Sequence, residues 1–175
     1  MADDRTAAYA RAMLDVARAE GNLAKVTDEL FRFGQALKAD DSIRQQLADQ
    51  HLPAAARQTA VESALSGRAL PTTVALVSMA VGGGRGGQLA AIIDDFVELT
   101  ASESGRAVAE VRSAVELSEE QQKRLADAIA KTTGRQVDVK VVIDPTVLGG
   151  LVTTVGDTVI DGSVKTRLEQ FKHAF

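Results

Sequence analysis

The sequence predicts a mainly α protein with a small α+β part at its C-terminal end. Apolar residues recur at helical spacing before Gly105 and alternate with other residues after it, so the hydrophobic period changes along the chain. Aromatic residues make up only 3% of the 175 residues, which leaves an aliphatic core suited to packing between helices. We therefore expect an N-terminal six-helix bundle over residues 1–105 and a small β-α-β-β-α domain over residues 106–175.

Two long apolar stripes and one short one predict the first three helices. The first stripe covers residues 9–17, and Gly21 follows it as a stop signal. The second covers residues 23–37. Asp40 and its neighbours offer side-chain oxygens for the N-terminal cap of a short third helix over residues 43–47.

The next three helices are bounded by proline and glycine. Pro53 suits the start of a fourth helix, because its missing N–H is not needed there, and Gly67 can end that helix in a left-handed cap. Residues 72–81 form a fifth helix that is apolar on nearly every side, which is typical of a helix buried in a bundle or covered by a partner. Residues 89–99 carry a sixth apolar stripe, with acidic residues facing water.

Alternating residues and one capping motif predict the first half of the C-terminal domain. Residues 107–111 alternate as in a strand. Ser118 and Gln121 form a capping box, in which each side chain bonds the other residue's backbone N–H at the start of a helix. Gly134 ends that helix, and residues 137–143 alternate again as a second strand.

A hairpin and a last helix complete the predicted domain. Asp144-Pro145 ends the second strand, since proline disfavours helix in the residue before it. Residues 151–155 and 158–160 are rich in β-formers and are separated by Gly156-Asp157, which predicts a tight hairpin. Residues 164–171 then carry apolar side chains at helical spacing.

Composition excludes several function classes. The net charge of -4 argues against a protein that tracks nucleic-acid phosphates, so we expect no nucleic-acid partner. The chain has no cysteine, which removes thiolate catalysis and cysteine metal sites, and two histidines alone make a poor metal site. No apolar run reaches the roughly 18 residues of a membrane span, and the first residues lack a signal or transit peptide pattern. We expect no catalytic site, cofactor or metal.

The glycine cluster at residues 82–87 leaves one alternative open. Gly82, Gly84 and Gly87 match the G-x-G-x-x-G pattern of a dinucleotide-binding turn. That template needs a strand before the glycines, whereas the preceding segment fits a helix. It also needs an acidic residue about 20 positions later, and Glu103 falls before the next predicted strand. A turn between two helices is the competing interpretation.

Motifs spread over the chain resemble one known family. Residues 144–152 read DPTVLGGLV, residues 155–157 read VGD, and residues 161–164 read DGSV before a helix. Residues 9–14 read YARAML and resemble the family's opening helix, and residues 107–118 resemble the junction between its two domains. Together these motifs resemble the ATP synthase delta family, which includes the mitochondrial oligomycin-sensitivity-conferring protein.

The resemblance implies two partner-binding regions. In this family a six-helix bundle caps the catalytic head and receives N-terminal helices of alpha subunits between its first and fifth helices. The C-terminal domain is held by the b subunits of the peripheral stalk. The alpha-binding residues implied here are Tyr9, Ala12, Met13, Val16, Val74, Val77, Ser78 and Val81. The b-binding residues implied here are Ser163, Val164, Arg167, Leu168 and Phe171.

The implied role is that of a non-catalytic stator subunit of a bacterial F-type ATP synthase. It would be present in one copy in a hetero-oligomer, at the cytoplasmic face of the cell membrane, and would reach the membrane only through the complex. Two alternatives remain: a generic helical adaptor, and a nucleotide-binding protein that uses residues 82–87.

Overall fold

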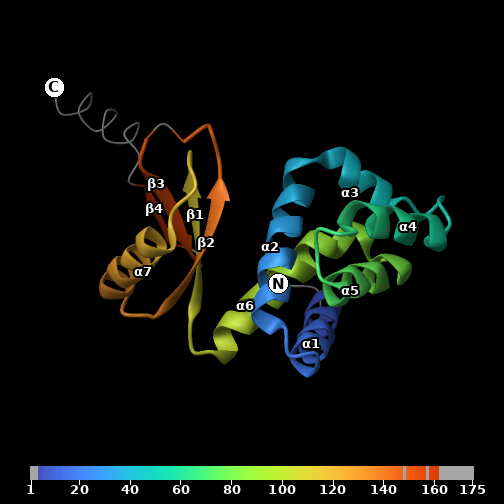
Figure 1. Cartoon of the computed structure of the whole chain (residues 1–175), viewed down its shortest axis with the longest axis horizontal. Coiled ribbons are helices and arrows are strands. Elements are labelled where there is room, and N and C mark those ends of the chain that lie inside the picture. The colour runs from blue at the N-terminus through green and yellow to red at the C-terminus, as the bar shows by residue number, and fades with distance from the viewer. Residues whose placement is uncertain (1–3, 148, 157, 162–175) are drawn as a thin grey trace. The chain divides into compact units, whose positions relative to one another are not determined.

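The computed structural model describes residues 4–147, 149–156 and 158–161 (Figure 1). Its contacts divide the chain into two compact units, Met1–Thr100 and Ala101–Phe175. The described part is mainly helical and contains one small mixed sheet of four strands, so the predicted class, mainly α with a small α+β part, is confirmed. The helix predicted over residues 164–171 lies outside the described residues.

The helices before Gly105 form where the apolar stripes predict them. The chain also makes a 3-10 turn within the glycine cluster, so part of the segment predicted as a turn is regular structure. The elements are α1 (Asp4–Ala19), α2 (Leu23–Ala39), α3 (Asp41–Ala48), α4 (Ala54–Leu65), α5 (Pro71–Gly82), η1 (Gly86–Gln88) and α6 (Leu89–Glu103).

Local signals set several of these helix ends. The Asp40 carboxylate accepts hydrogen bonds from the N–H groups of Ser42 at 2.8 Å and Ile43 at 3.3 Å, and so caps α3 as predicted. Gly21 and Gly67 follow α1 and α4 with φ of 71° and 69°, a backbone conformation that glycine adopts without strain.

The start of α5 is fixed by a residue from another helix. The Glu29 carboxylate, on α2, accepts hydrogen bonds from the Leu70 N–H at 2.8 Å and from the Thr73 hydroxyl at 2.6 Å. A carboxylate at this position satisfies a free N–H group and interacts favourably with the positive end of the helix dipole. The bond ties α2 to α5.

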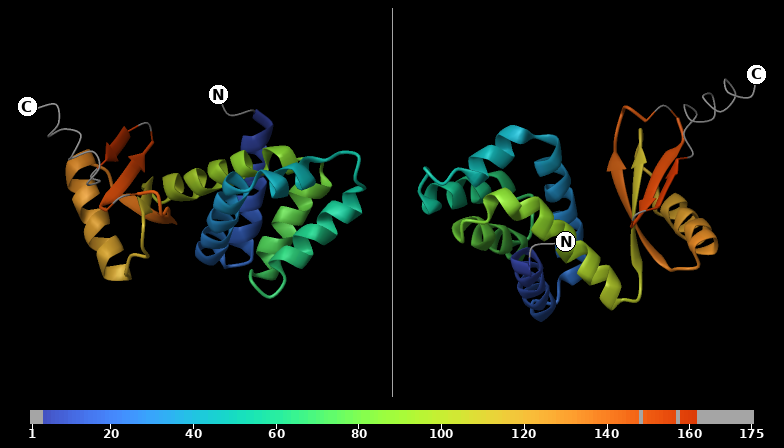
Figure 2. Two further views of the ribbon diagram at one scale, coloured as in Figure 1. Left: turned by 90° about the horizontal axis from the view of Figure 1, so that it is seen from above. Right: turned by 180° about the vertical axis from the view of Figure 1, so that it is seen from behind.

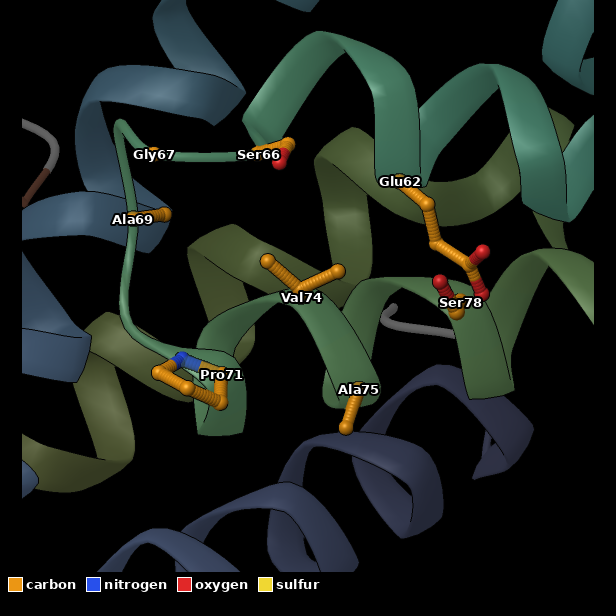
Figure 3. Close-up of a pocket in the computed structure, with 8 residues that line it drawn as sticks. All are labelled: Glu62, Ser66, Gly67, Ala69, Pro71, Val74, Ala75 and Ser78. Atoms are coloured by element: carbon orange, nitrogen blue, oxygen red, sulfur yellow. The ribbon is translucent and has the colours of Figure 1, made fainter.

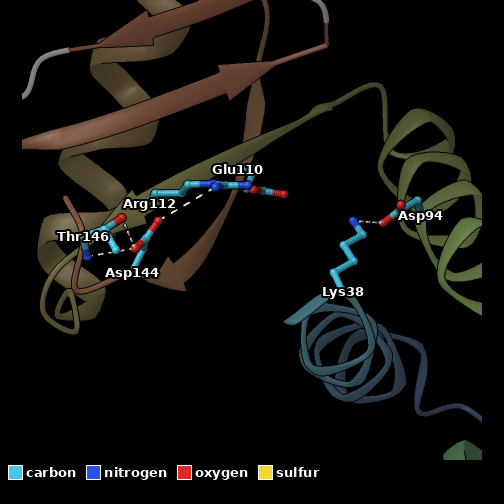
Figure 4. Close-up of polar contacts among 6 residues, drawn as sticks. All are labelled: Lys38, Asp94, Glu110, Arg112, Asp144 and Thr146. Carbon is cyan, nitrogen blue, oxygen red and sulfur yellow. Dashed lines mark hydrogen bonds and ion pairs between the residues drawn. The ribbon is translucent and has the colours of Figure 1, made fainter. Parts of the chain in front are cut away.

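The core of the first unit is aliphatic, as its composition predicts. Its largest fully buried side chain is Phe96 on α6, and Leu89, Ile92 and Ile93 on the same helix are also buried. On the surface, Lys38 on α2 and Asp94 on α6 form an ion pair at 2.8 Å (Figure 4).

The end of α3 packs closely against the glycine cluster. A Cβ atom added at Gly86 would lie 1.8 Å from the Leu47 carbonyl oxygen, so only glycine fits there without a backbone shift. The same carbonyl accepts a hydrogen bond at 3.4 Å from the guanidinium of Arg57, a residue only 7% exposed. Gly86 therefore permits the contact between α3 and η1.

The second unit is a four-stranded sheet with α7 (Glu119–Thr133) along one face (Figure 2). The strands stand in the order β2-β1-β3-β4. The pair β1–β2 is parallel, and the pairs β1–β3 and β3–β4 are antiparallel, the latter being the predicted hairpin. The strands are β1 (Ala107–Ser113), β2 (Val137–Ile143), β3 (Leu151–Val155) and β4 (Thr158–Asp161).

The predicted capping box starts α7. The Ser118 hydroxyl accepts a hydrogen bond from the Gln121 N–H at 3.3 Å, and the Gln121 side chain accepts one from the Ser118 N–H at 2.8 Å. Ile129 on α7 then packs with Ala109 of β1 and Val137 of β2 in a small core. The helix covers the face of the sheet on which these alternate strand residues lie.

A polar cluster fixes the end of β2 (Figure 4). The Asp144 carboxylate accepts hydrogen bonds from the Thr146 hydroxyl at 2.6 Å and the Thr146 N–H at 2.9 Å, and Arg112 on β1 lies 3.8 Å away. The Thr146 hydroxyl, then the Thr146 N–H and the Arg112 charge, hold the pKa of Asp144 below its ordinary value of 3.8; desolvation acts in the opposite direction.

Because the folded pKa of Asp144 is the lower one, its ionised form stabilises the fold above pH 3.8, and this contribution is lost as the pH falls through the folded pKa. We expect Thr146→Val to raise this pKa more than Arg112→Gln does, since hydrogen bonding outweighs the distant charge. Carboxyl NMR titrations of the two variants and the wild type measure the shifts. A larger effect of Arg112→Gln would contradict the assigned cause.

We expect Gly86→Ala to lower the free energy of unfolding by about 2 kcal/mol or more, because the new methyl group overpacks against a backbone carbonyl that cannot move alone. Urea unfolding of the full chain measures the change. Gly87→Ala is the matched control, since its Cβ would lie 3.4 Å from the Ala48 Cβ, an ordinary contact. Equal stability of the two variants would show that the α3–η1 contact is not tight.

Candidate functional site

The helices α1 and α5, predicted to bind the partner helix, contact one another in the structure. Figure 3 shows α1 running beneath α5, with the Ala75 side chain pointing toward it. Tyr9 on α1 reaches the other end of α5, where a Cβ atom added at Gly83 would lie 2.7 Å from the Tyr9 hydroxyl oxygen. The face formed by these two helices, called the α1–α5 face below, is thus bounded by Ala75 and Gly83.

Half of the predicted alpha-binding residues lie inside the first unit. Met13, Val77 and Val81 each have an exposed fraction of 0%, and Ser78 is 7% exposed. The apolar side chains of Met13, Val77 and Val81 pack in the interior of the first unit. Ser78 lies on the α4 side of α5.

The other four predicted residues reach the surface. Ala12 is exposed, Val16 is 42% exposed, and Tyr9 and Val74 are half-buried. Val16 is one of the large hydrophobic side chains that the first unit leaves in contact with solvent. Tyr9, Ala12 and Val16 therefore contribute area to the surface of the α1–α5 face, whereas Val74 points into a pocket on the α4 side of α5 (Figure 3).

Sequence reasoning missed two exposed residues of α5. Met79 is 43% exposed and Ala75 is also exposed, although both belong to the helix whose apolarity all round pointed to partner binding. Helical spacing from Ala75 to Met79 is four residues, which places them on one side of α5. The spacing of Ala75 and Met79 is visible in the sequence. The pattern does not show which side of the helix faces solvent, because every side is apolar.

A contact between Arg85 and the Tyr9 ring lies at one end of the α1–α5 face. The Arg85 guanidinium lies 5.7 Å from the centroid of the Tyr9 ring, within the range of a cation–π interaction. Arg85 also donates a hydrogen bond to the Gln88 side chain at 3.2 Å. These contacts hold Tyr9 against the turn that follows α5.

The structure contradicts the dinucleotide-binding alternative. A helix, α5, precedes the glycine cluster, where the template requires a strand. The glycines have packing or backbone reasons of their own: Gly86 allows the approach of Leu47, and Gly84 has a φ of 75°. The cluster is accounted for as a connection between α5 and α6.

The predicted b-binding residues, Ser163, Val164, Arg167, Leu168 and Phe171, lie outside the described residues. The described sheet carries charged side chains on the face opposite α7. Glu110 of β1 is in register with Lys140 of β2, and Arg112 lies 3.2 Å from the Glu110 carboxylate. In the hairpin, Val159 of β4 is 63% exposed.

Within the described ranges, no group of three or more His, Asp or Glu side chains is arranged to hold a metal ion. None of the helices described in the structure is both long and apolar enough to cross a membrane.

Comparison with solved structures supports the fold. A chain of the cryo-EM structure of the Toxoplasma gondii mitochondrial ATP synthase hexamer matches with a TM-score of 0.60 and 22% sequence identity, covering 98% of this chain and 97% of that chain. At this level of identity the match shows a shared fold.

Sequence comparison identifies the family. The family model described as ATP synthase delta (OSCP) subunit matches residues 6–175. The ATP synthase subunit delta of Streptomyces griseus is 42% identical over 90% of this chain, and that of Salinispora arenicola is 39% identical over 93%. This chain spans 58% and 60% of the length of those relatives. The chain belongs to the ATP synthase delta (OSCP) subunit family.

Proposed function

We propose that this chain is a non-catalytic stator subunit of a bacterial F-type ATP synthase, which links the catalytic head to the peripheral stalk. The observation that carries the proposal is the family match over residues 6–175, in a chain whose contacts divide into two units. A protein that joins two partners needs two binding regions. The proposed head-binding region is a six-helix bundle over residues 1–105, and the proposed stalk-binding region is the β-α-β-β-α domain over residues 106–175.

The α1–α5 face is the proposed site for alpha-subunit N-termini. Exposed apolar side chains on both helices, Val16 on α1 and Met79 on α5, support it, with Ala12 and Ala75 as small residues that let a visiting helix approach closely. An amphipathic helix binds such a face with its apolar side, and methionine adapts to the shape of its partner.

The last residues of the chain are the proposed site for b subunits. The residues concerned are Ser163, Val164, Arg167, Leu168 and Phe171, and the support for them is the family resemblance of the motif that precedes them. The hairpin β3–β4 leads into this segment. When one partner is bound, the second binding region is held close to the other partner at a high effective concentration. Neither contact therefore needs extreme affinity.

In this role the chain turns over no substrate and needs no cofactor. Rotor torque acts on the catalytic head, and an unanchored head would turn with the rotor. We place one copy of the chain in each complex, on the cytoplasmic face of the cell membrane, with membrane contact only through the other subunits. A generic helical adaptor is the alternative, and it would not need the stalk contact.

The first experiment tests the α1–α5 face by calorimetry. A peptide of the N-terminal residues of the alpha subunit from the same organism is titrated into wild-type protein and into Val16→Glu. We expect at least tenfold weaker binding by the variant, about 1.4 kcal/mol, because the new carboxylate is desolvated by the docked helix. The folding of the variant should be unchanged, since Val16 is 42% exposed.

Ile43→Glu is the matched control, because Ile43 is 38% exposed on α3, away from the proposed face. It adds the same charge and should bind the peptide as the wild type does. Equal weakening by both variants would indicate a general effect of charge. Wild-type affinity in Val16→Glu would remove the α1–α5 face from the proposal.

The stalk contact is tested with Leu168→Glu in the full chain. We expect this variant to lose binding to a peptide of the C-terminal residues of the b subunit while keeping its affinity for the alpha peptide. An apolar stripe that docks on a partner does not tolerate a buried, unpaired charge. Two calorimetric titrations of the same sample measure both affinities. Loss of both affinities would point to unfolding, and loss of neither would favour the adaptor alternative.

A further inference from the structure

A pocket of about 380 Å³ lies between α4 and α5, on the α4 side of the proposed partner-binding helix (Figure 3). Its walls include Pro71 and Val74 from α5 and Ala69 from the loop before it. These side chains give it a mainly apolar lining. Figure 3 shows Glu62 reaching from α4 toward Ser78 on α5 at one end of the pocket.

Two polar side chains in this pocket lack partners among the residues that the structure describes. The Ser78 hydroxyl oxygen is buried, in a residue only 7% exposed, and it forms no hydrogen bond with any described residue. The Glu62 carboxylate makes no hydrogen bond or ion pair with any residue that the structure describes. A buried hydroxyl is normally paired in a folded protein, so an unpaired one at a pocket marks a place where a ligand donor fits.

The charge of the pocket selects a cation. Glu62 is the one ionisable residue among the described residues that line it. An apolar wall with a carboxylate at one end suits a long side chain that has an aliphatic stem and a cationic head. Of the two candidates, arginine carries donors in a planar fork and is more weakly hydrated than lysine, so one guanidinium can serve both a carboxylate and a hydroxyl.

The pocket also adjoins the α1–α5 face. Ala75 lines the pocket, is exposed, and points toward α1 (Figure 3). A segment that lies along α5 therefore passes the mouth of the pocket at Ala75. Ala75 is small, so it leaves room at this point for a long side chain of that segment.

We propose that the pocket between α4 and α5 receives an arginine side chain of the protein segment that docks on α5, with the guanidinium held by Glu62 and Ser78. The proposal rests on the partner-binding role proposed above for α5 and names a specificity contact within it. Glu62 is exposed, so a cation entering the pocket can reach its carboxylate at the end where Ser78 lies (Figure 3).

The first test uses a probe that needs no partner protein. The full chain, labelled with nitrogen-15, is titrated with N-acetyl-arginine amide and, separately, with N-acetyl-citrulline amide, an uncharged molecule of nearly the same shape. We expect the arginine probe to shift the amide signals of Glu62, Ser66 and Ser78, and the citrulline probe to leave them in place. Glu62→Gln should abolish the shifts, while Glu98→Gln, at an exposed carboxylate on α6, should keep them.

Ser78→Ala separates binding from folding. Removing a hydroxyl that has no partner should leave Tm equal to or above the wild-type value, yet weaken the arginine probe. A variant that lowered Tm would show that the hydroxyl is paired inside the protein. Shifts that are absent, equal for both probes, or unaffected by Glu62→Gln would overturn the proposal.

A second titration separates this proposal from the one on which it rests. The alpha-subunit peptide, and variants with each basic residue changed in turn to glutamine, are titrated into wild-type protein and Glu62→Gln. We expect one of these peptide variants to bind wild-type protein at least tenfold more weakly than the unchanged peptide does. The same peptide change should have little effect on binding to Glu62→Gln. A peptide that binds equally to both proteins overturns the arginine pocket alone, and a peptide that binds neither overturns the α1–α5 face.

Discussion

The burial of α5 is the constraint on which the first unit depends. This helix presents apolar side chains in nearly every direction, so the first unit is stabilised when neighbouring helices cover most of it. Val77 and Val81 are fully buried, and Glu29 from α2 fixes the first turn. At the opposite end, Tyr9 and Arg85 close over the glycine turn. Met79 and Ala75 stay exposed on α5, and they belong to the surface proposed to bind another protein.

The sequence predicts the elements of this fold well because their signals are local. The capping box at Ser118, the glycine after α1 and the turn between β3 and β4 each depend on a few adjacent residues. The Glu29 cap and the contact of Gly86 with Leu47 join distant parts of the chain, and no local pattern specifies them. The glycines of residues 82–87 predict a turn, but the pattern does not indicate that Gly86 permits close packing against Leu47.

For the candidate site, too, the sequence predicts local features and does not predict those that depend on tertiary packing. Helical spacing finds the apolar residues of α1 and α5, but burial depends on how the helices rotate against one another, which is a property of tertiary packing. Met13 and Val16 look alike in the pattern, and one is 0% and the other 42% exposed. The unpaired hydroxyl of Ser78 is likewise visible only once α4 has been placed beside α5.

The order of strands in the second unit has a mechanical consequence. Strand β1 enters the sheet at Ala107, and β4 leaves it at Asp161, with β3 between them and antiparallel to both. Strands β1 and β4 therefore run in the same direction, and these two points lie at opposite ends of the sheet. Tension applied between them shears the β1–β3 and β3–β4 hydrogen bonds together instead of peeling them apart one at a time. A domain connected in this way resists extension through many bonds at once, as the proposed stator role would require.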